Sequence, residues 1–110
     1  MKRRLNLRAR TDCSVRARVG SIVSHYRGVE LSPTGIVIDR GRPIAPRDER
    51  IFLHLEIILP ERLRPLRAVA RPIWSTGTQQ AFKFVKMSDV DRLNLAEHVD
   101  RAEFKNRIFH

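Results

Sequence analysis

Hydrophobic and polar residues alternate over several short segments in the first 87 positions, which is the pattern of half-buried β-strands. In residues 12–19 the apolar members of this alternation are Cys13, Val15, Ala17 and Val19. The strongest segment has one wholly apolar face, formed by Ile51, Leu53, Leu55, Ile57 and Leu59. We predict six strands, over residues 12–19, 22–31, 35–38, 51–59, 66–75 and 80–85.

After residue 87 the spacing of apolar residues changes from two to about 3.6, which predicts an amphipathic helix over 88–104. Ser88 is a suitable N-cap and Asp91 a weak capping-box partner. The predicted apolar face consists of Val90, Leu93, Ala96, Val99 and Ala102. Several strands followed by one helix predict a mainly β fold, a six-stranded antiparallel β-barrel with a C-terminal α-helix. We therefore expect one domain, with a flexible arm at 1–11, the barrel at 12–87, the helix at 88–104 and a tail at 105–110.

Composition limits the functional class. The 110 residues suit a single globular domain, and no apolar run is long enough to span a membrane. One cysteine, Cys13, excludes an internal disulfide and is expected to be a buried structural thiol. The four histidines show no metal-ligand spacing, and no nucleophile or P-loop motif is present. We expect a cytoplasmic protein that is not an enzyme and holds no metal or cofactor.

Charge points to an anionic partner. The formal net charge is +10, and seven of the 22 Lys and Arg residues lie within the first 18 positions. Arginine predominates there, and its planar guanidinium binds phosphate and guanine edges through paired hydrogen bonds. A second arginine-rich stretch, Arg40 to Arg50, is open to two readings, a solvated loop or a contact for a larger anion.

Two short stretches together suggest one ligand site. The first, RLNLR (Arg4 to Arg8), presents an R-x-x-x-R pair, and the second is ELSPTG (Glu30 to Gly35). Arginines can clamp phosphates or pair with guanine, while an acidic side chain accepts from the guanine N1 and N2 edge. A turn with serine and glycine adds a hydroxyl group and accessible backbone N–H groups.

These stretches, in this order, resemble the signature pair of the PilZ domain family, R-x-x-x-R followed by [D/N]-x-S-x-x-G. The segments LHLEIILP, ARPIWS and AFKFVKMSDVDRLNL look like the family's later strands and helix, so the resemblance covers nearly the whole chain. The resemblance implies a PilZ-like split barrel as the fold. It also implies a function, that of a bacterial receptor for cyclic di-GMP that relays the signal to a protein effector in motility, exopolysaccharide synthesis or biofilm control.

The resemblance also assigns residues. Arg4 and Arg8 would hold guanines and phosphates, and Glu30, Ser32 and Gly35 would line the opposite wall. The additional candidates are Arg3, Arg10, Trp74 and Ala81. For Trp74, packing in the core or at the rim is the favoured reading.

Two departures from the family pattern keep alternatives open. Glu30 stands where the pattern has Asp or Asn, and its extra methylene displaces the carboxylate by about 1.5 Å, the length of a C–C bond. We expect this displacement to weaken binding by about 1–3 kcal/mol. Ala81 stands where glycine is frequent, and its methyl would crowd the pocket. The alternatives are a PilZ-type interaction module that no longer binds the dinucleotide and a small basic barrel that binds nucleic acid non-specifically.

Overall fold

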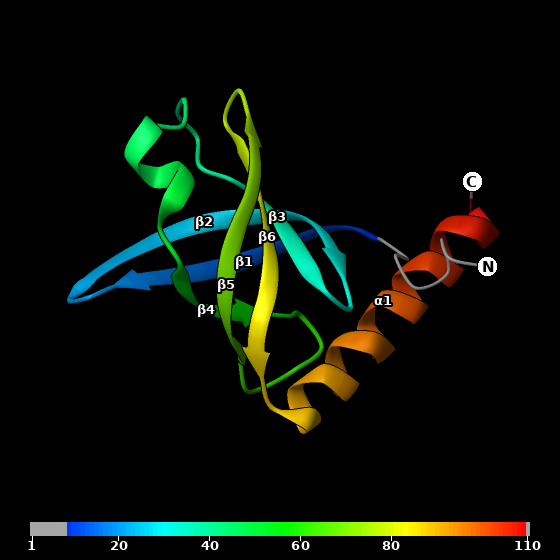
Figure 1. Ribbon diagram of the computed structural model, residues 1–110. Coiled ribbons are helices and arrows are strands. Elements are labelled where there is room, and N and C mark those ends of the chain that lie inside the picture. The colour runs from blue at the N-terminus through cyan, green and yellow to red at the C-terminus, as the bar shows by residue number, and fades with distance from the viewer. Residues whose placement is uncertain (1–8, 110) are drawn as a thin grey trace.

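The computed structural model describes residues 9–109 and shows a closed antiparallel β-barrel with one helix packed against it (Figure 1). The strands are β1 (Ala9–Val19), β2 (Ile22–Ser32), β3 (Gly35–Asp39), β4 (Leu53–Ile58), β5 (Leu66–Thr76) and β6 (Gln79–Met87). A short 3₁₀ helix (Pro46–Arg50) lies in the long β3–β4 connection, and α1 (Asp89–Phe109) follows β6. The predicted fold class, a six-stranded barrel with a C-terminal helix, is confirmed.

The barrel closes because β1 pairs on both of its edges. In order around the barrel the strands are β1, β2, β3, β6, β5 and β4, and β4 then pairs with β1 from Ser14 to Arg18. β1 and β2 are joined by a two-residue turn in which Gly20 has φ 59°. Glycine at the first position of such a turn is typical of type II′ hairpins, whose twist matches that of the strands.

The alternation read from the sequence fills the barrel. Cys13, Val15 and Ala17 are buried on β1 as predicted, although Val19 at the tip of the hairpin is exposed. Leu53, Leu55, Ile57 and Leu59 are also buried. Burial raises the pKa of the Cys13 thiol to about 11, so this side chain is a packed, unreactive thiol.

The predicted boundaries of β1 and α1 are wrong. β1 begins at Ala9, so residues 9–11 belong to the barrel although their sequence does not alternate. A β-bulge between Arg10 and Cys13 interrupts the alternation without ending the pairing with β2. α1 runs to Phe109 instead of residue 104, since no glycine or proline follows to stop it. The predicted loop at 40–50 contains the 3₁₀ helix.

Ser88 caps the start of α1 as predicted, and the predicted apolar face is right at Val99 and Ala102 but wrong at Val90 and Leu93. The Asp91 amide donates to Ser88 Oγ at 3.1 Å. The Asp91 carboxylate accepts from the Arg67 amide on β5 at 3.1 Å, so it fixes the helix to the barrel. Leu95 and Val99, one turn apart, are fully buried, whereas Val90 and Leu93 remain exposed. The helix therefore packs on the barrel through Leu95 and Val99, and Val90 and Leu93 of the predicted face point to solvent.

The β4–β5 loop holds the other side of α1 through two polar contacts. His98 Nδ1 and Glu61 Oε2 lie 2.5 Å apart, and Arg62 donates to Glu97 at 2.7 Å. Partial burial disfavours the charge on Glu61, but the hydrogen bond from His98 and the neighbouring positive charges outweigh it and lower the pKa of this carboxyl. Glu61 is therefore an ionised acceptor that ties the loop to the helix.

One packing contact in the barrel yields a stability prediction. Gly28 pairs with Cys13 across β1 and β2, and a methyl group at Gly28 would lie 2.6 Å from Cys13 Sγ. We expect Gly28→Ala to lower the free energy of unfolding by about 1–3 kcal/mol through overpacking. In a Cys13→Ala background the cost should be smaller, because the closest atom is gone. Denaturant unfolding of the four proteins measures this coupling, and an equal cost in both backgrounds would contradict the account.

Candidate ligand-binding site

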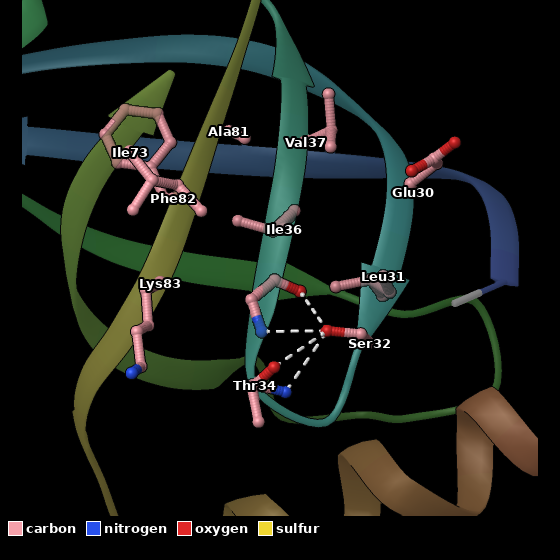
Figure 2. A pocket seen from close by; sticks show the side chains of 11 residues that line it. Glu30, Leu31, Ser32, Thr34, Ile36, Val37, Ile73, Ala81, Phe82 and Lys83 are labelled. Carbon is pink, nitrogen blue, oxygen red and sulfur yellow. Dashed lines mark hydrogen bonds between the residues drawn. The ribbon is translucent and has the colours of Figure 1, made fainter. Parts of the chain in front are cut away.

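A pocket of about 290 Å³ lies where the end of β2 and the start of β3 meet β5 and β6. The residues that line it are Glu30, Leu31, Ser32, Thr34, Gly35, Ile36, Val37, Ile73, Ala81, Phe82 and Lys83 (Figure 2). Of the residues predicted from the sequence, the pocket therefore brings together Glu30, Ser32, Gly35 and Ala81. The rest of its wall is supplied by β5 and β6, which are remote in sequence.

Ser32 holds the turn between β2 and β3 in shape. Its Oγ accepts hydrogen bonds from the backbone N–H groups of Gly35 at 3.0 Å and Thr34 at 3.2 Å (Figure 2). The remaining contacts of this oxygen are long, 3.3 Å to Thr34 Oγ1 and 3.4 Å to the Gly35 carbonyl. The hydroxyl proton is therefore weakly engaged and can turn toward a ligand at little cost.

Gly35 is required by the approach of another strand. A Cβ atom at this position would lie 2.3 Å from the carbonyl oxygen of Phe82 on β6. Backbone cannot move aside as a flexible side chain can, so a side chain at Gly35 would push β3 and β6 apart. The sequence suggested that this glycine lets a ligand approach the main chain. The structure supplies a nearer reason, the packing of two strands at the floor of the pocket.

The pairing of β1 with β2 fixes what lies beside the pocket. Ala9 pairs with Leu31 and Arg10 pairs with Glu30, which itself pairs with Val37 on β3. Residues directly opposite on antiparallel strands have Cβ atoms about 4.5–5.5 Å apart. The exposed Arg10 is thus a direct neighbour of Glu30. Arg3, Arg4 and Arg8 lie outside the described residues, but Arg8 immediately precedes Ala9 in the chain.

β5 and β6 add two lining residues that sequence reasoning missed. Ile73 is the bulged residue between Pro72 and Trp74 and lies exposed at the rim. Lys83 pairs with Gly35 and places a cation across β3 from Glu30 (Figure 2). The alternation in AFKF was the available signal for Lys83, because it sets this side chain opposite to the buried Phe82 and Phe84.

Of the additional candidates Ala81 and Trp74, only Ala81 lines the pocket. Ala81 is buried in the pocket wall. Trp74 pairs with Ala81 across β5 and β6 but does not line this pocket. It lines a separate hollow with Glu49, Pro72 and Gln80 and is 42% exposed, so it sits at the rim.

Other kinds of site are not evident in the part of the chain that the structure describes. Residues 9–109 contain no group of three or more histidine, cysteine or acidic side chains placed to hold a metal ion. Within the same range, no helix is long and apolar enough to cross a membrane.

Solved structures share this architecture. The Bacillus subtilis inhibitor of motility (MotI/DgrA) matches with a TM-score of 0.76 at 17% identity, over 92% of this chain. The PilZ domain of Escherichia coli YcgR, solved with c-di-GMP, matches with a TM-score of 0.72 at 13% identity, over 91% of both chains. This chain has the fold of a PilZ domain. The agreement confirms the fold that the two sequence motifs implied.

The share of each neighbour's length that this chain covers differs. This chain spans about half, 51%, of the length of the inhibitor of motility. An uncharacterized Legionella protein, Lpg0364, matches with a TM-score of 0.55 at 16% identity, over 91% of this chain and 97% of its own. No protein-family model and no curated protein sequence matches the chain.

The turn of this PilZ fold gives a prediction that needs no ligand. Ser32→Ala removes the acceptor for two backbone N–H groups, so we expect the free energy of unfolding to fall by about 1–3 kcal/mol. Denaturant unfolding measures the loss. Ser14→Ala is a matched control, because its side chain is exposed on β1 and makes no hydrogen bond among the described residues. Equal stability of the Ser32→Ala and Ser14→Ala proteins would show that the hydroxyl does not hold the turn.

Proposed function

We propose that this protein is a non-enzymatic receptor for cyclic di-GMP, which binds between the arginine-rich N-terminal segment and the pocket at the β2–β3 turn. The supporting observation is the pairing of Ala9 with Leu31 and of Arg10 with Glu30. Ala9 directly follows the first motif in the chain, and it pairs with Leu31 of the second. Arg4 and Arg8, which precede Ala9 in the chain, would then reach the wall formed by Glu30 and Ser32.

The chemistry of the two walls is complementary. Guanidinium groups of Arg4 and Arg8 would bind phosphates and the O6 and N7 edge of guanine, with Arg3 and Arg10 as additional cations. The Glu30 carboxylate would accept from the N1 and N2 edge, and Ser32 would donate its hydroxyl proton. Lys83 extends the assignment, because its amine can neutralise a phosphate on the far side of the pocket.

Pocket size requires the second wall. A volume of about 290 Å³ is at the lower end of the range for small-ligand pockets, and a cyclic dinucleotide is a large ligand. The barrel surface alone would leave much of the ligand in water. An arginine segment that folds over the ligand would enclose it. It would also supply net positive charge, which the barrel wall lacks because Glu30 and Lys83 balance each other.

The output of such a receptor would be the ordered arginine segment, which presents a new surface to a protein effector. One structural neighbour is named as an inhibitor of motility, and another was solved with the dinucleotide. These names support a role in cyclic di-GMP signalling, with motility as the first process to examine. We propose that the protein acts in the cytoplasm.

Calorimetric titration of the whole chain with cyclic di-GMP tests the proposal. We expect micromolar or tighter affinity, lost by at least about tenfold in Arg8→Ala, which corresponds to removal of one charge-assisted hydrogen-bonded contact. Arg92→Ala is the matched control, since Arg92 is an exposed arginine on α1.

The same titration of the Glu30→Asp protein tests the position of the carboxylate. Glu30→Asp should bind cyclic di-GMP more tightly if the longer side chain misplaces the carboxylate, and an unchanged affinity would refute that part of the account.

A parallel titration with a short oligonucleotide at two salt concentrations separates the rivals. The net charge of +10 is what favours a nucleic-acid binder. Binding of the oligonucleotide alone, with a steep salt dependence, would establish that function instead. Absence of binding to either ligand would leave an interaction module of the PilZ type that has lost its ligand.

A further inference from the structure

The β1–β2 hairpin extends beyond the barrel. β2 pairs with β3 only from Arg27 to Ser32, so residues 22–26 pair with β1 alone in the described structure. On the other side, β1 pairs with β4 only as far as Arg18. Figure 1 shows the hairpin tip projecting well past the other strands. β1 thus stays paired with β4 to within one residue of its end, and the tip consists of the turn from Val19 to Ile22 beside the open edge of β2.

The tip of this ribbon is aliphatic and exposed. Val19 and Ile22 form the pair that flanks the turn and are 41% and 69% exposed. The next pair is Arg18 with Val23, and Val23 is 47% exposed on the opposite face. Aliphatic side chains are therefore uncovered on both faces of the same protruding turn. Clustered exposed apolar groups of this kind mark surfaces that meet a partner.

Arginines surround the aliphatic tip. On one face, Arg42 and Arg47 from the β3–β4 loop line a pocket of about 270 Å³ together with Val19 and Ile22. On the other face, Arg16 and Arg18 line a separate hollow with Val23. Arg16 is paired there with Glu56 at 2.7 Å, so Arg18 is the cation nearer the tip on this face. Asp48 approaches both Arg42 and Arg47, but only at 3.7 Å and 3.9 Å, so the first face retains net positive charge.

The loop that carries these arginines is fixed to the barrel. Arg40 donates to Gln80 at 2.7 Å and to the Tyr26 hydroxyl at 2.9 Å. Gln80 is fully buried and donates to the Asp48 carbonyl at 2.9 Å. This network connects the ribbon, the loop and β6, so Arg42 and Arg47 extend from an anchored loop beside the tip.

We propose that the β1–β2 hairpin tip docks on the surface of an anionic lipid bilayer. Val19, Ile22 and Val23 would enter the headgroup layer, and the surrounding arginines would contact lipid phosphates. A convex tip with apolar groups on both faces needs a medium that encloses it, which a bilayer interface provides. Arg18 lies one residue, about 3.3 Å, behind Val19. Entry of the tip by about 5–10 Å therefore brings arginine to the level of the phosphates.

This surface is separate from the proposed nucleotide site. Ile22 and Ser32 are the two ends of the 11-residue strand β2, which spans about 33 Å when extended. The inference does not depend on binding of cyclic di-GMP, and each of the two activities can fail alone.

A fluorescent label tests insertion of the tip. Ser21→Cys, in the turn, carries an environment-sensitive fluorophore, while the buried Cys13 stays unlabelled. The probes are vesicles of phosphatidylcholine alone and vesicles in which phosphatidylglycerol replaces part of it. We expect co-sedimentation with the anionic vesicles and a blue shift of the label. The same label at Leu63→Cys, a fully exposed position in the β4–β5 loop, should not shift. An equal shift at both positions, or none at Ser21→Cys, would overturn the proposal.

Matched substitutions separate insertion from charge. Ile22→Ser should weaken partition into anionic vesicles by about tenfold, because its burial is lost. Leu93→Ser, with a similar exposure of 63% on α1, should leave partition unchanged. Arg42→Gln with Arg47→Gln should weaken it, and Arg92→Gln should not. Retention of binding in Ile22→Ser would show a purely electrostatic attraction of the +10 chain and would refute the docking tip. Binding of polyglutamate that is lost in Ile22→Ser, together with no binding of anionic vesicles, would assign the surface to an acidic protein instead.

Discussion

The pairing of β1 with β2 sets the positions of Arg10, Glu30 and the hairpin tip relative to one another. Two strands of eleven residues can align in many ways, and a slip of one residue would turn the whole inward face outward. Cys13 opposite Gly28 helps to fix the alignment, because the sulfur fills the space that the missing side chain leaves. The same alignment brings the start of β1 to Glu30 and carries the other end of the hairpin beyond the barrel. One register thus creates a walled pocket at one end of the ribbon and an uncovered tip at the other.

The serine and glycine of the β2–β3 turn illustrate how a ligand motif also serves the fold. Ser32 accepts two backbone hydrogen bonds, and Gly35 makes room for the carbonyl of Phe82. Both would be needed to build this corner of the barrel even without a ligand. Lys83 and Arg10 are charged and exposed, and neither holds the turn in this way. Affinity should therefore depend on the charged groups, and the turn provides a rigid surface against which they act.

Much of the fold could be predicted from the sequence because most strands have one face in the core of the barrel and one face toward solvent. Period-two alternation identified the strands, and the change to a helical period located α1. The errors lie where pairing or docking overrides the local pattern. Ala9 is in β1 because Leu31 pairs with it, and Val90 is exposed because the helix docks through Leu95 and Val99. Neither fact is encoded in the spacing of apolar residues.

The site was predictable only in part, for a related reason. Motif spacing identified Glu30, Ser32 and Gly35, which are close in sequence and share one turn. Lys83 and Ile73 come from β6 and β5, and only barrel closure places them at the same pocket. The hairpin tip was not recognised at all, since the alternation of residues 12–19 predicted a buried Val19. Its exposure follows from where β4 and β3 cease to pair, which is a property of the whole barrel.

Hydrogen–deuterium exchange of the full chain, with and without cyclic di-GMP, tests the central claim that two separated motifs form one site. The account predicts that amides in residues 1–10 and 30–35 become protected together when the dinucleotide is added, while residues 18–26 of the hairpin exchange as before. Protection of the β2–β3 turn without the N-terminal segment, or binding that protects neither, would contradict it.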